Sequence, residues 1–175
     1  MTEEIDWDNL TFSLTPTDTM YITETGINDA WMPGELMPYG DMKISPAAGV
    51  LNYGQGLFEG MKAYRTAKNR VVFFRPEENA RRMQRGADRL KMPPVPESIF
   101  IDATEQCVQA NIRWLPPMGK GAMYVRPLLM GSGPILGVAP APSYRFLVYV
   151  TPVGPYFKGG VKAIDLLISD VHHRA

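Results

Sequence analysis

The segment that decides the fold is Asn52–Arg65, "NYGQGLFEGMKAYR", with three glycines in its first nine residues. A phosphate-binding loop needs its glycines to lead directly into a helix N-terminus, where free backbone N–H groups bind the anion. Here they lead into "MKAYR", which has the pattern of a strand, and neither the GxGxxG nor the Walker spacing is present. The phosphate-loop interpretation therefore fails for this segment.

Two other interpretations stay open from these residues alone. The segment can be a glycine-dependent turn or bulge that packs Leu57 and Phe58 against the core. Alternatively, Tyr53 and Phe58 line a ligand pocket, since glycines allow a ligand to approach the backbone closely. The elements around the segment have to decide between the two.

Those surrounding segments predict strands separated by two helices. "MKAYR" and "RVVFFRP" flank the short connection "TAKN", which is the pattern of a β-hairpin. Apolar residues recur at helical spacing in Pro76–Leu90 and again in Glu97–Trp114, where Pro116–Pro117 stop the second helix. The other expected elements are strands at Thr19–Glu24, Gly121–Gly131, Tyr144–Gly154 and Val161–Ser169, a turn-rich connection at Met32–Asp41 and an extended segment at Lys43–Gly54.

This order lacks the regular alternation of strand and helix that builds a parallel sheet. We therefore expect an α+β fold with a largely antiparallel sheet and two main helices. Residues 1–153 are predicted to form a small N-terminal domain and residues 154–163 an interdomain linker. Residues 164–175 are expected to be the first strand of a second, larger domain.

Composition excludes several classes of protein. Lysine plus arginine and aspartate plus glutamate both number 18, so the net charge of zero argues against a nucleic-acid or anionic-membrane binder. No apolar run is long enough to span a membrane. The single Cys107 suits a reducing compartment, and the acidic "MTEEIDWDNL" resembles no signal or transit peptide. Cytoplasm is the expected location, although an organellar transit peptide removed earlier would leave no trace here.

Arginines are the first candidates for chemistry. Arg82, Arg85 and Arg89 follow spacings of three and four, so they share one face of the predicted helix. Such a face is either a solvated surface or an anion site. In the second case Arg82, near the helix start, would bind a phosphate together with the helix N-terminus.

A second candidate is "YVRP" in the strand Gly121–Gly131. Tyr124 and Arg126 point to the same side of a strand, and an arginine in an apolar strand needs a polar partner. The pair therefore predicts either carboxylate recognition or a structural ion pair. His172 and His173 are adjacent and would face opposite sides of a strand, so no metal site is expected.

Several long segments are similar, in order and spacing, to the branched-chain aminotransferases. They are "LNYGQGLFEGMKAYR", "FRPEENARRMQRGADRL", "MYVRPLLMGSGPILGVAPAP" and "TPVGPYFK", and "WDNLTFSLTPTDTMY" and "MPYGDMKISPAAGVLNYG" resemble the larger, eukaryote-type branch. The resemblance covers nearly all 175 residues. It implies a homodimeric enzyme of pyridoxal 5′-phosphate (PLP) fold type IV that moves an amino group between leucine, isoleucine or valine and 2-oxoglutarate.

The resemblance also implies roles for individual residues. Arg82 would bind the PLP phosphate, and Tyr53 and Phe58 would line the apolar side-chain pocket. Tyr124 and Arg126 would stand at the dimer-shared side of the active site and accommodate the second carboxylate of glutamate. The quoted segment is therefore expected to be a pocket wall, with glycines that serve close packing.

The same resemblance implies two further roles, and at one point the sequence departs from the family pattern. Val138 would lie on a loop that closes over the neighbouring subunit's pocket, and Tyr156 would lie near the substrate at the interdomain connection. In the family the Schiff-base lysine follows a motif resembling "HHRA", and this sequence ends at Ala175. Lys158 and Lys162 do not match that motif, so we assign no catalytic residue and expect the chain to be inactive by itself.

Two other functions are compatible with the sequence. One is a non-catalytic fragment or domain that keeps the fold for binding or dimer assembly. The other is a different fold type IV enzyme, such as a D-amino-acid aminotransferase or an aminodeoxychorismate lyase, which the long matches at "GQGLFEGMKAYR" and "GPILGVAPAP" disfavour.

Overall fold

A computed structural model of the protein describes residues 5–155 and 163–171. Its strands are β1 (Thr19–Gly26), β2 (Glu35–Pro38), β3 (Gly56–Phe58), β4 (Met61–Arg65), β5 (Val71–Phe73), β6 (Ala122–Gly131) and β7 (Ser143–Val153). Its helices are α1 (Gly49–Tyr53), α2 (Pro76–Arg89), α3 (Glu97–Ala110) and the short 3-10 helix Ile112–Trp114. The strands form one sheet in the order β2-β1-β7-β6-β4-β5, with β3 also paired to β6. Every pairing between these strands is antiparallel, which confirms the predicted α+β class.

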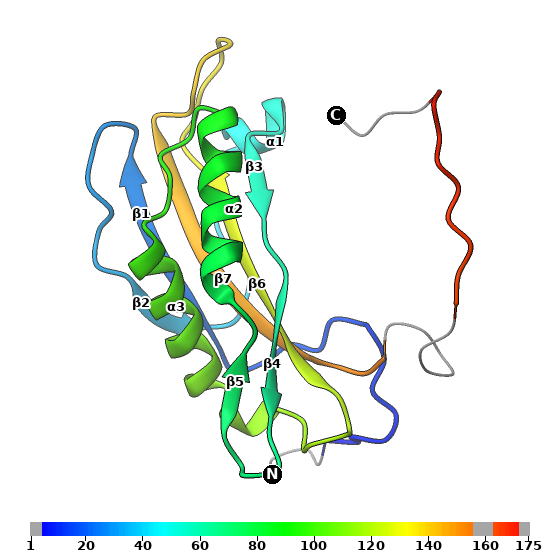
Figure 1. The fold of residues 1–175 in the computed structure, drawn as a ribbon. Coiled ribbons are helices and arrows are strands. Elements are labelled where there is room, and N and C mark those ends of the chain that lie inside the picture. Colours follow the sequence, from blue (N-terminus) through cyan, green and yellow to red (C-terminus); the bar gives the residue numbers. More distant parts are fainter. Residues whose placement is uncertain (1–4, 156–162, 172–175) are drawn as a thin grey trace.

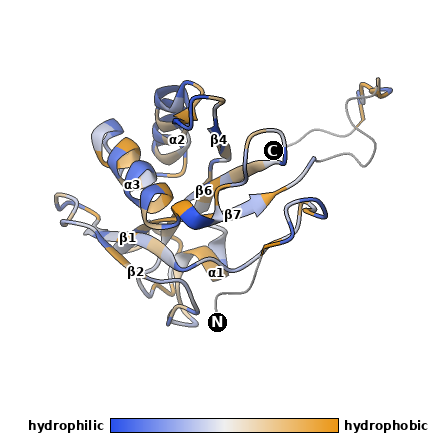
Figure 2. Cartoon of the chain, turned by 90° about the horizontal axis from the view of Figure 1, so that it is seen from below, coloured by the Kyte–Doolittle hydropathy of each residue, from blue (hydrophilic) through white to orange (hydrophobic). Residues whose placement is uncertain are grey.

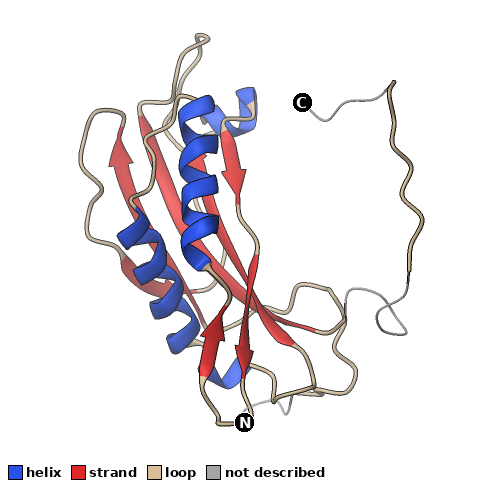
Figure 3. Cartoon of the chain, in the orientation of Figure 1, coloured by secondary structure: helices blue, strands red, loops and turns tan. Residues whose placement is uncertain are grey.

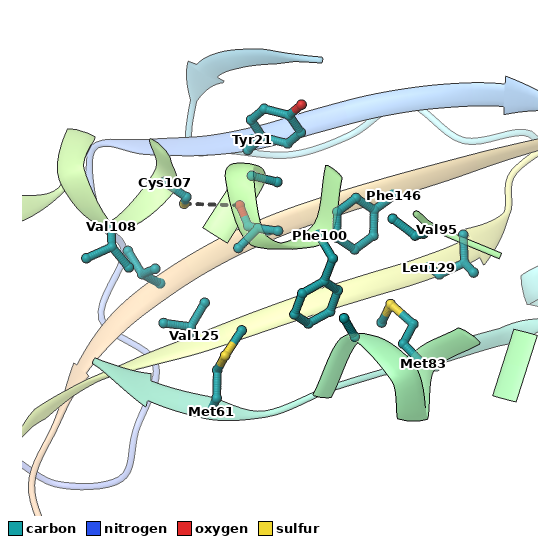
Figure 4. Close-up of a cluster of buried hydrophobic side chains, with 14 of the residues drawn as sticks. Tyr21, Met61, Met83, Val95, Phe100, Cys107, Val108, Val125, Leu129 and Phe146 are labelled. Carbon is teal, nitrogen blue, oxygen red and sulfur yellow. Dashed lines mark hydrogen bonds between the residues drawn. The ribbon is translucent and has the colours of Figure 1, made fainter. Parts of the chain in front are cut away.

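The fold has two layers, with α2 and α3 lying across one face of the sheet (Figures 1 and 3). Residues from both layers meet in a core that contains Met83, Phe100, Val125, Leu129 and Phe146 (Figure 4). Because side chains alternate along a strand, Tyr124, Arg126 and Leu128 of β6 project from the opposite face of the sheet. That second face carries the polar residues discussed below.

Both long helices begin where their sequence predicts. Pro76 starts α2 and is followed by Glu77 and Glu78, which suits the positive end of the helix dipole, while Arg89 lies in the last turn. Buried residues in α2 are Ala80, Met83 and Ala87, and those in α3 are Phe100, Ala103, Thr104, Cys107 and Val108. Outside this apolar stripe α2 is largely hydrophilic (Figure 2). Each helix is therefore held by one face against the sheet.

A break in the sheet separates β3 from β4 at Glu59 and Gly60. The two short strands pair with different parts of β6, and the backbone N–H of Glu59 donates to Pro127 O at 2.9 Å between them. Pro127 has no N–H to return a ladder hydrogen bond, so the pairing is weakest at this point. The break lets Phe58 and Glu59 leave the regular strand geometry.

Three expectations for local structure are wrong. The turn-rich connection contains β2, whose backbone pairs with β1 although its own sequence is a weak strand former. The extended segment before the glycines contains α1, which at five residues is too short to show a helical period. The second main helix ends at Ala110 because the buried side chain of Asn111 closes it, and a 3-10 turn follows.

The C-terminal expectations have a mixed outcome. Residues 163–171 belong to no strand or helix, so the described part of the expected strand is not formed. A strand needs a hydrogen-bonded neighbour, and a pattern of apolar residues alone does not supply one. Most of the expected linker lies outside the described residues, and the domain boundaries stay predictions. In the described ranges, no helix has the length and apolar character needed to cross a bilayer.

We expect Cys107 to make the protein less stable at alkaline pH. The thiol is buried and donates to Val148 O at 3.3 Å, and burial raises its pKa to about 12. An unfolded thiol ionises near pH 8.5. The neutral thiol therefore costs the native state nothing below that pH, but above it the unfolded state loses its proton first and stability falls.

The free energy of unfolding should fall by up to about 1.4 kcal/mol per pH unit between roughly pH 9 and 12 because of this thiol. Urea unfolding of the wild type and Cys107→Ala over this range measures it, since the alanine variant lacks this thiol. Equal slopes for the two proteins would contradict the expectation.

Candidate functional site

Glycines in the opening segment have two distinct structural roles. Gly54 ends α1 with φ of 64°, a left-handed conformation that favours glycine. A Cβ atom on Gly60 would lie 2.2 Å from the hydroxyl oxygen of Tyr124, so only glycine permits that approach. The glycines thus serve a turn and close packing, and the segment leads into the strand β4 as predicted.

Phe58, Tyr124 and Arg126 form one group, which we call the Arg126 cluster. The Arg126 guanidinium carbon lies 4.0 Å from the ring centroid of Phe58, and Nη2 donates to the Tyr124 hydroxyl at 2.9 Å. Tyr124 and Arg126 lie on the same face of β6, as the sequence predicts. Phe58 comes from the neighbouring β3, where the sheet is broken.

The Arg126 cluster leaves a buried hydrogen-bond donor unused. Nε of Arg126 is buried and has no hydrogen-bond partner within residues 5–155 and 163–171. No carboxylate in these ranges forms an ion pair with Arg126, so the structural ion pair considered from sequence is not found there. A buried guanidinium donor without an acceptor is costly. This arrangement suits an external anionic group.

A small pocket opens beside the cluster. It has a volume of about 120 Å³ and is lined by Phe12, Ser13, Leu14, Tyr124, Arg126, Tyr149, Thr151 and Val153. Phe12 and Tyr124 pack edge to face with ring centroids 5.4 Å apart. Ligand pockets usually measure about 300–1,000 Å³, so this one has room for a few atoms of a larger molecule. A carboxylate or a short side chain is the size that fits.

Arg82 lies in a separate ion pair with Glu59. Its Nε donates to Glu59 Oε1 at 2.6 Å and its Nη2 donates to Oε2 at 2.5 Å. These hydrogen bonds are the main cause of a raised pKa of Arg82, and the charge of Glu59 raises this pKa further. At 3.6 residues per turn, Arg82 lies near the end of the second turn of α2, and the first turn carries Glu77 and Glu78. Arg82 is thus about two turns into the helix, and its phosphate role stays a prediction.

The remaining predicted residues lie elsewhere. The Tyr53 hydroxyl donates to Leu136 O, which ties α1 to the loop between β6 and β7. Val138 on that loop is 94% exposed, so its side chain contacts little of this chain. Tyr156 lies outside the described residues. The predicted set thus divides into the Arg126 cluster, the Arg82 pair, and Tyr53 with the loop that carries Val138.

Sequence reasoning missed four residues near these groups. Tyr149 lies directly opposite Arg126 on β7, and Lys62 lies opposite Tyr124 on β4, so strand alternation would find both once the pairing is known. Phe12 lies in an irregular segment and gives no periodic signal. Glu59 gives a different kind of signal, because an acid between an aromatic residue and a glycine stands out in the sequence. Metal ligands do not cluster anywhere in the described parts of the chain.

Comparison with known proteins finds similar sequences, although no family model matches this one. The chain is 56% identical over 172 residues to "Branched-chain amino acid aminotransferase 2, chloroplastic" of Humulus lupulus, covering 98% of this chain and 42% of that protein. The chain is homologous to branched-chain aminotransferases. It is also 54% identical over 173 residues to "Branched-chain-amino-acid aminotransferase 3, chloroplastic" of Arabidopsis thaliana, with coverages of 98% and 42%.

Another relative is named for a different substrate. A methionine aminotransferase of Arabidopsis thaliana is 44% identical over 171 residues, which cover 98% of this chain and 48% of that protein. The chain thus spans less than half the length of these relatives. The chloroplastic names of the first two give the expected cytoplasmic location no support.

Solved structures confirm the fold. The branched-chain aminotransferase of Escherichia coli matches with a TM-score of 0.66 and 23% identity over 82% of this chain and 42% of that one. The T.th. branched-chain aminotransferase, solved with pyridoxamine 5′-phosphate, matches with a TM-score of 0.63 and 26% identity over 83% and 43%. The two-layer domain therefore has the fold of the N-terminal domain of these fold type IV aminotransferases.

Proposed function

We propose that the chain supplies the small domain of a PLP-dependent branched-chain amino acid transaminase. The enzyme would move an amino group between leucine, isoleucine or valine and 2-oxoglutarate. The observation that carries the proposal is the Arg126 cluster, in which a buried guanidinium donor without an acceptor lies beside aromatic rings. Such a site offers contacts to both of the side chains that this reaction has to accept.

The two substrate classes make opposite demands on one pocket. A branched aliphatic side chain needs apolar surface, and Phe58, which is 54% exposed, offers it. The second carboxylate of glutamate needs a charged donor, which Arg126 provides through its unpaired Nε. Stacking against Phe58 keeps the guanidinium in place while either substrate is bound. Tyr124 fixes its other end through the hydroxyl.

Arg82 is the residue that would hold the cofactor phosphate. Its side chain is 63% exposed, and its outer edge is not occupied by Glu59. A guanidinium edge suits a phosphoryl group because it donates two parallel hydrogen bonds. When bound, PLP supplies the electron sink for transamination, and this chain's part is to bind and orient its phosphate. The residues present therefore fit the cofactor.

Other parts of the proposal rest on the relatives. The Schiff-base lysine would come from sequence equivalent to the part of the relatives that this chain does not span. Val138 would close over the neighbouring subunit's pocket in a homodimer, because its loop exposes Leu136 and Val138 almost fully. Tyr53 would line the apolar side-chain pocket. Tyr156 would lie at the substrate. Plastid or mitochondrial location is proposed from the names of the relatives.

A hybrid enzyme tests the proposal. The chain would replace the matching 172 residues of the Humulus lupulus relative, and the hybrid would be assayed for transfer from leucine to 2-oxoglutarate. We expect it to bind PLP, form dimers and reach at least about a tenth of the intact relative's kcat/KM. The intact relative is the control. A folded, dimeric hybrid that binds PLP without transferring the amino group would instead support the non-catalytic interpretation.

A further inference from the structure

A buried carboxylate lies between the Arg126 cluster and Arg82. Glu59 is only 5% exposed and sits at the break between β3 and β4, next to Phe58. Its backbone N–H donates to Pro127 O, and its Oε2 accepts a hydrogen bond from Asn79 Nδ2 at 2.8 Å. These contacts fix the carboxylate independently of Arg82. Neither substrate of the proposed reaction requires an acid at this place.

The carboxylate uses only one edge of the Arg82 guanidinium. Nε and Nη2 donate to its two oxygens in a bidentate arrangement. A guanidinium has five N–H donors, so the three on its outer side remain. They have no other acceptor in the part of the chain that the structure describes, and the side chain is largely exposed. Glu59 therefore sets the direction in which these donors point.

Two roles for such an acid have opposite consequences. A carboxylate that competes for Arg82 would weaken phosphate binding, because it partly neutralises the guanidinium. A carboxylate that orients Arg82 would strengthen binding, because a free arginine side chain loses rotamer entropy when it is ordered. Glu78, which pairs with Arg75 and Arg81, is 42% exposed and able to move, whereas Glu59 is buried and held by Asn79. The fixed position favours orientation.

We infer that Glu59 is a positioning residue that holds Arg82 by its inner edge and presents the outer edge to the phosphoryl group of the cofactor. This role rests on the proposed cofactor contact of Arg82. Glu59 itself does not touch the phosphate. In the same way, a carboxylate that accepts a hydrogen bond from a metal-binding histidine fixes the orientation of that histidine.

The test follows the Arg82 side chain in the 175-residue chain itself. Its Nε–H resonance is assigned in ¹H–¹⁵N spectra and titrated with pyridoxamine 5′-phosphate, which has no aldehyde to react with lysines, and with inorganic phosphate. The variants are Glu59→Gln, which keeps the size of the side chain, and Glu59→Asp, which keeps the charge. Glu78→Gln is the matched control on the exposed pair. Thermal unfolding checks that each variant folds, and Asn79→Ala replaces Glu59→Gln if that variant does not.

We expect both ligands to shift the Arg82 resonance in the wild type and in Glu78→Gln with the same affinity. Glu59→Gln should bind about tenfold more weakly, which corresponds to about 1.4 kcal/mol, and Glu59→Asp should lie between. Equal or tighter binding by Glu59→Gln would show competition and overturn the inference, as would an Arg82 resonance that neither ligand shifts in the wild type. Transamination by the hybrid enzyme is measured separately. An active hybrid combined with unchanged binding in Glu59→Gln would therefore reject this inference alone.

Discussion

Replacing Asn111 with alanine should destabilise the domain by about 3–5 kcal/mol, a large part of the 5–15 kcal/mol typical of a whole domain. The side chain is fully buried. Its Oδ1 accepts from the backbone N–H groups of Asp18 and Thr19 at 3.0 and 3.1 Å, and its Nδ2 donates to Thr19 O and Cys107 O. Alanine would remove these four hydrogen bonds, and the N–H groups of Asp18 and Thr19 would lose the acceptor that they share.

The position of Asn111 explains the size of this effect. One amide joins the start of β1 to the end of α3, so it connects the two layers of the fold. Urea unfolding measures the change. Asn52→Ala is the control, because Asn52 also donates to backbone carbonyls but is exposed, and its loss should cost less than about 1 kcal/mol. A loss below about 1.5 kcal/mol for Asn111→Ala would mean that water or neighbouring groups replace the amide.

Replacing Arg126 with leucine in the hybrid enzyme should lower kcat/KM for 2-oxoglutarate about 30- to 100-fold. The variant removes the charged donor that would bind the second carboxylate, a contact worth about 2–3 kcal/mol. It keeps an apolar side chain against Phe58. Transfer from leucine to the 2-oxo acid of isoleucine should therefore change less than about threefold. Steady-state kinetics with the two acceptors measure both values.

Arg145→Leu serves as the control for that experiment. Arg145 is also a strand arginine, on β7, but it pairs with Glu24 and donates to Lys43 O. Its replacement should leave the ratio between the two acceptors within about twofold. If Arg126→Leu lowers kcat/KM for both acceptors equally, Arg126 supports the site as a whole and does not recognise the second carboxylate.

Much of the fold could be predicted because its main elements are long and patterned. The helical stripe of α2 and the alternation along β6 are visible in the sequence, and Pro76 marks where α2 begins. β2 and α1 were missed because their stability comes from partners elsewhere in the chain: β2 depends on pairing with β1, and α1 is a single turn ended by Gly54. Local sequence contains neither kind of information.

The candidate site was only partly predictable for a similar reason. Alternation along one strand places Tyr124 and Arg126 on the same face, and this is confirmed. The stacking of Phe58 on Arg126 needs the register between β3 and β6, which a single sequence does not provide. The pairing of Glu59 with Arg82 joins residues 23 positions apart, and Phe12 reaches the pocket from an irregular segment. These contacts are tertiary, and only a structure gives them.

Phe58 and Glu59 are consecutive, yet one contacts Arg126 and the other Arg82. A single peptide bond thus sets the spacing between the two arginines that face the proposed substrate and the proposed cofactor. We therefore expect a change at residue 58 that moves the backbone also to move Glu59 and so to affect both proposed sites. Side-chain exchanges that preserve the backbone are expected to alter one contact alone, whereas an insertion or deletion here would displace both.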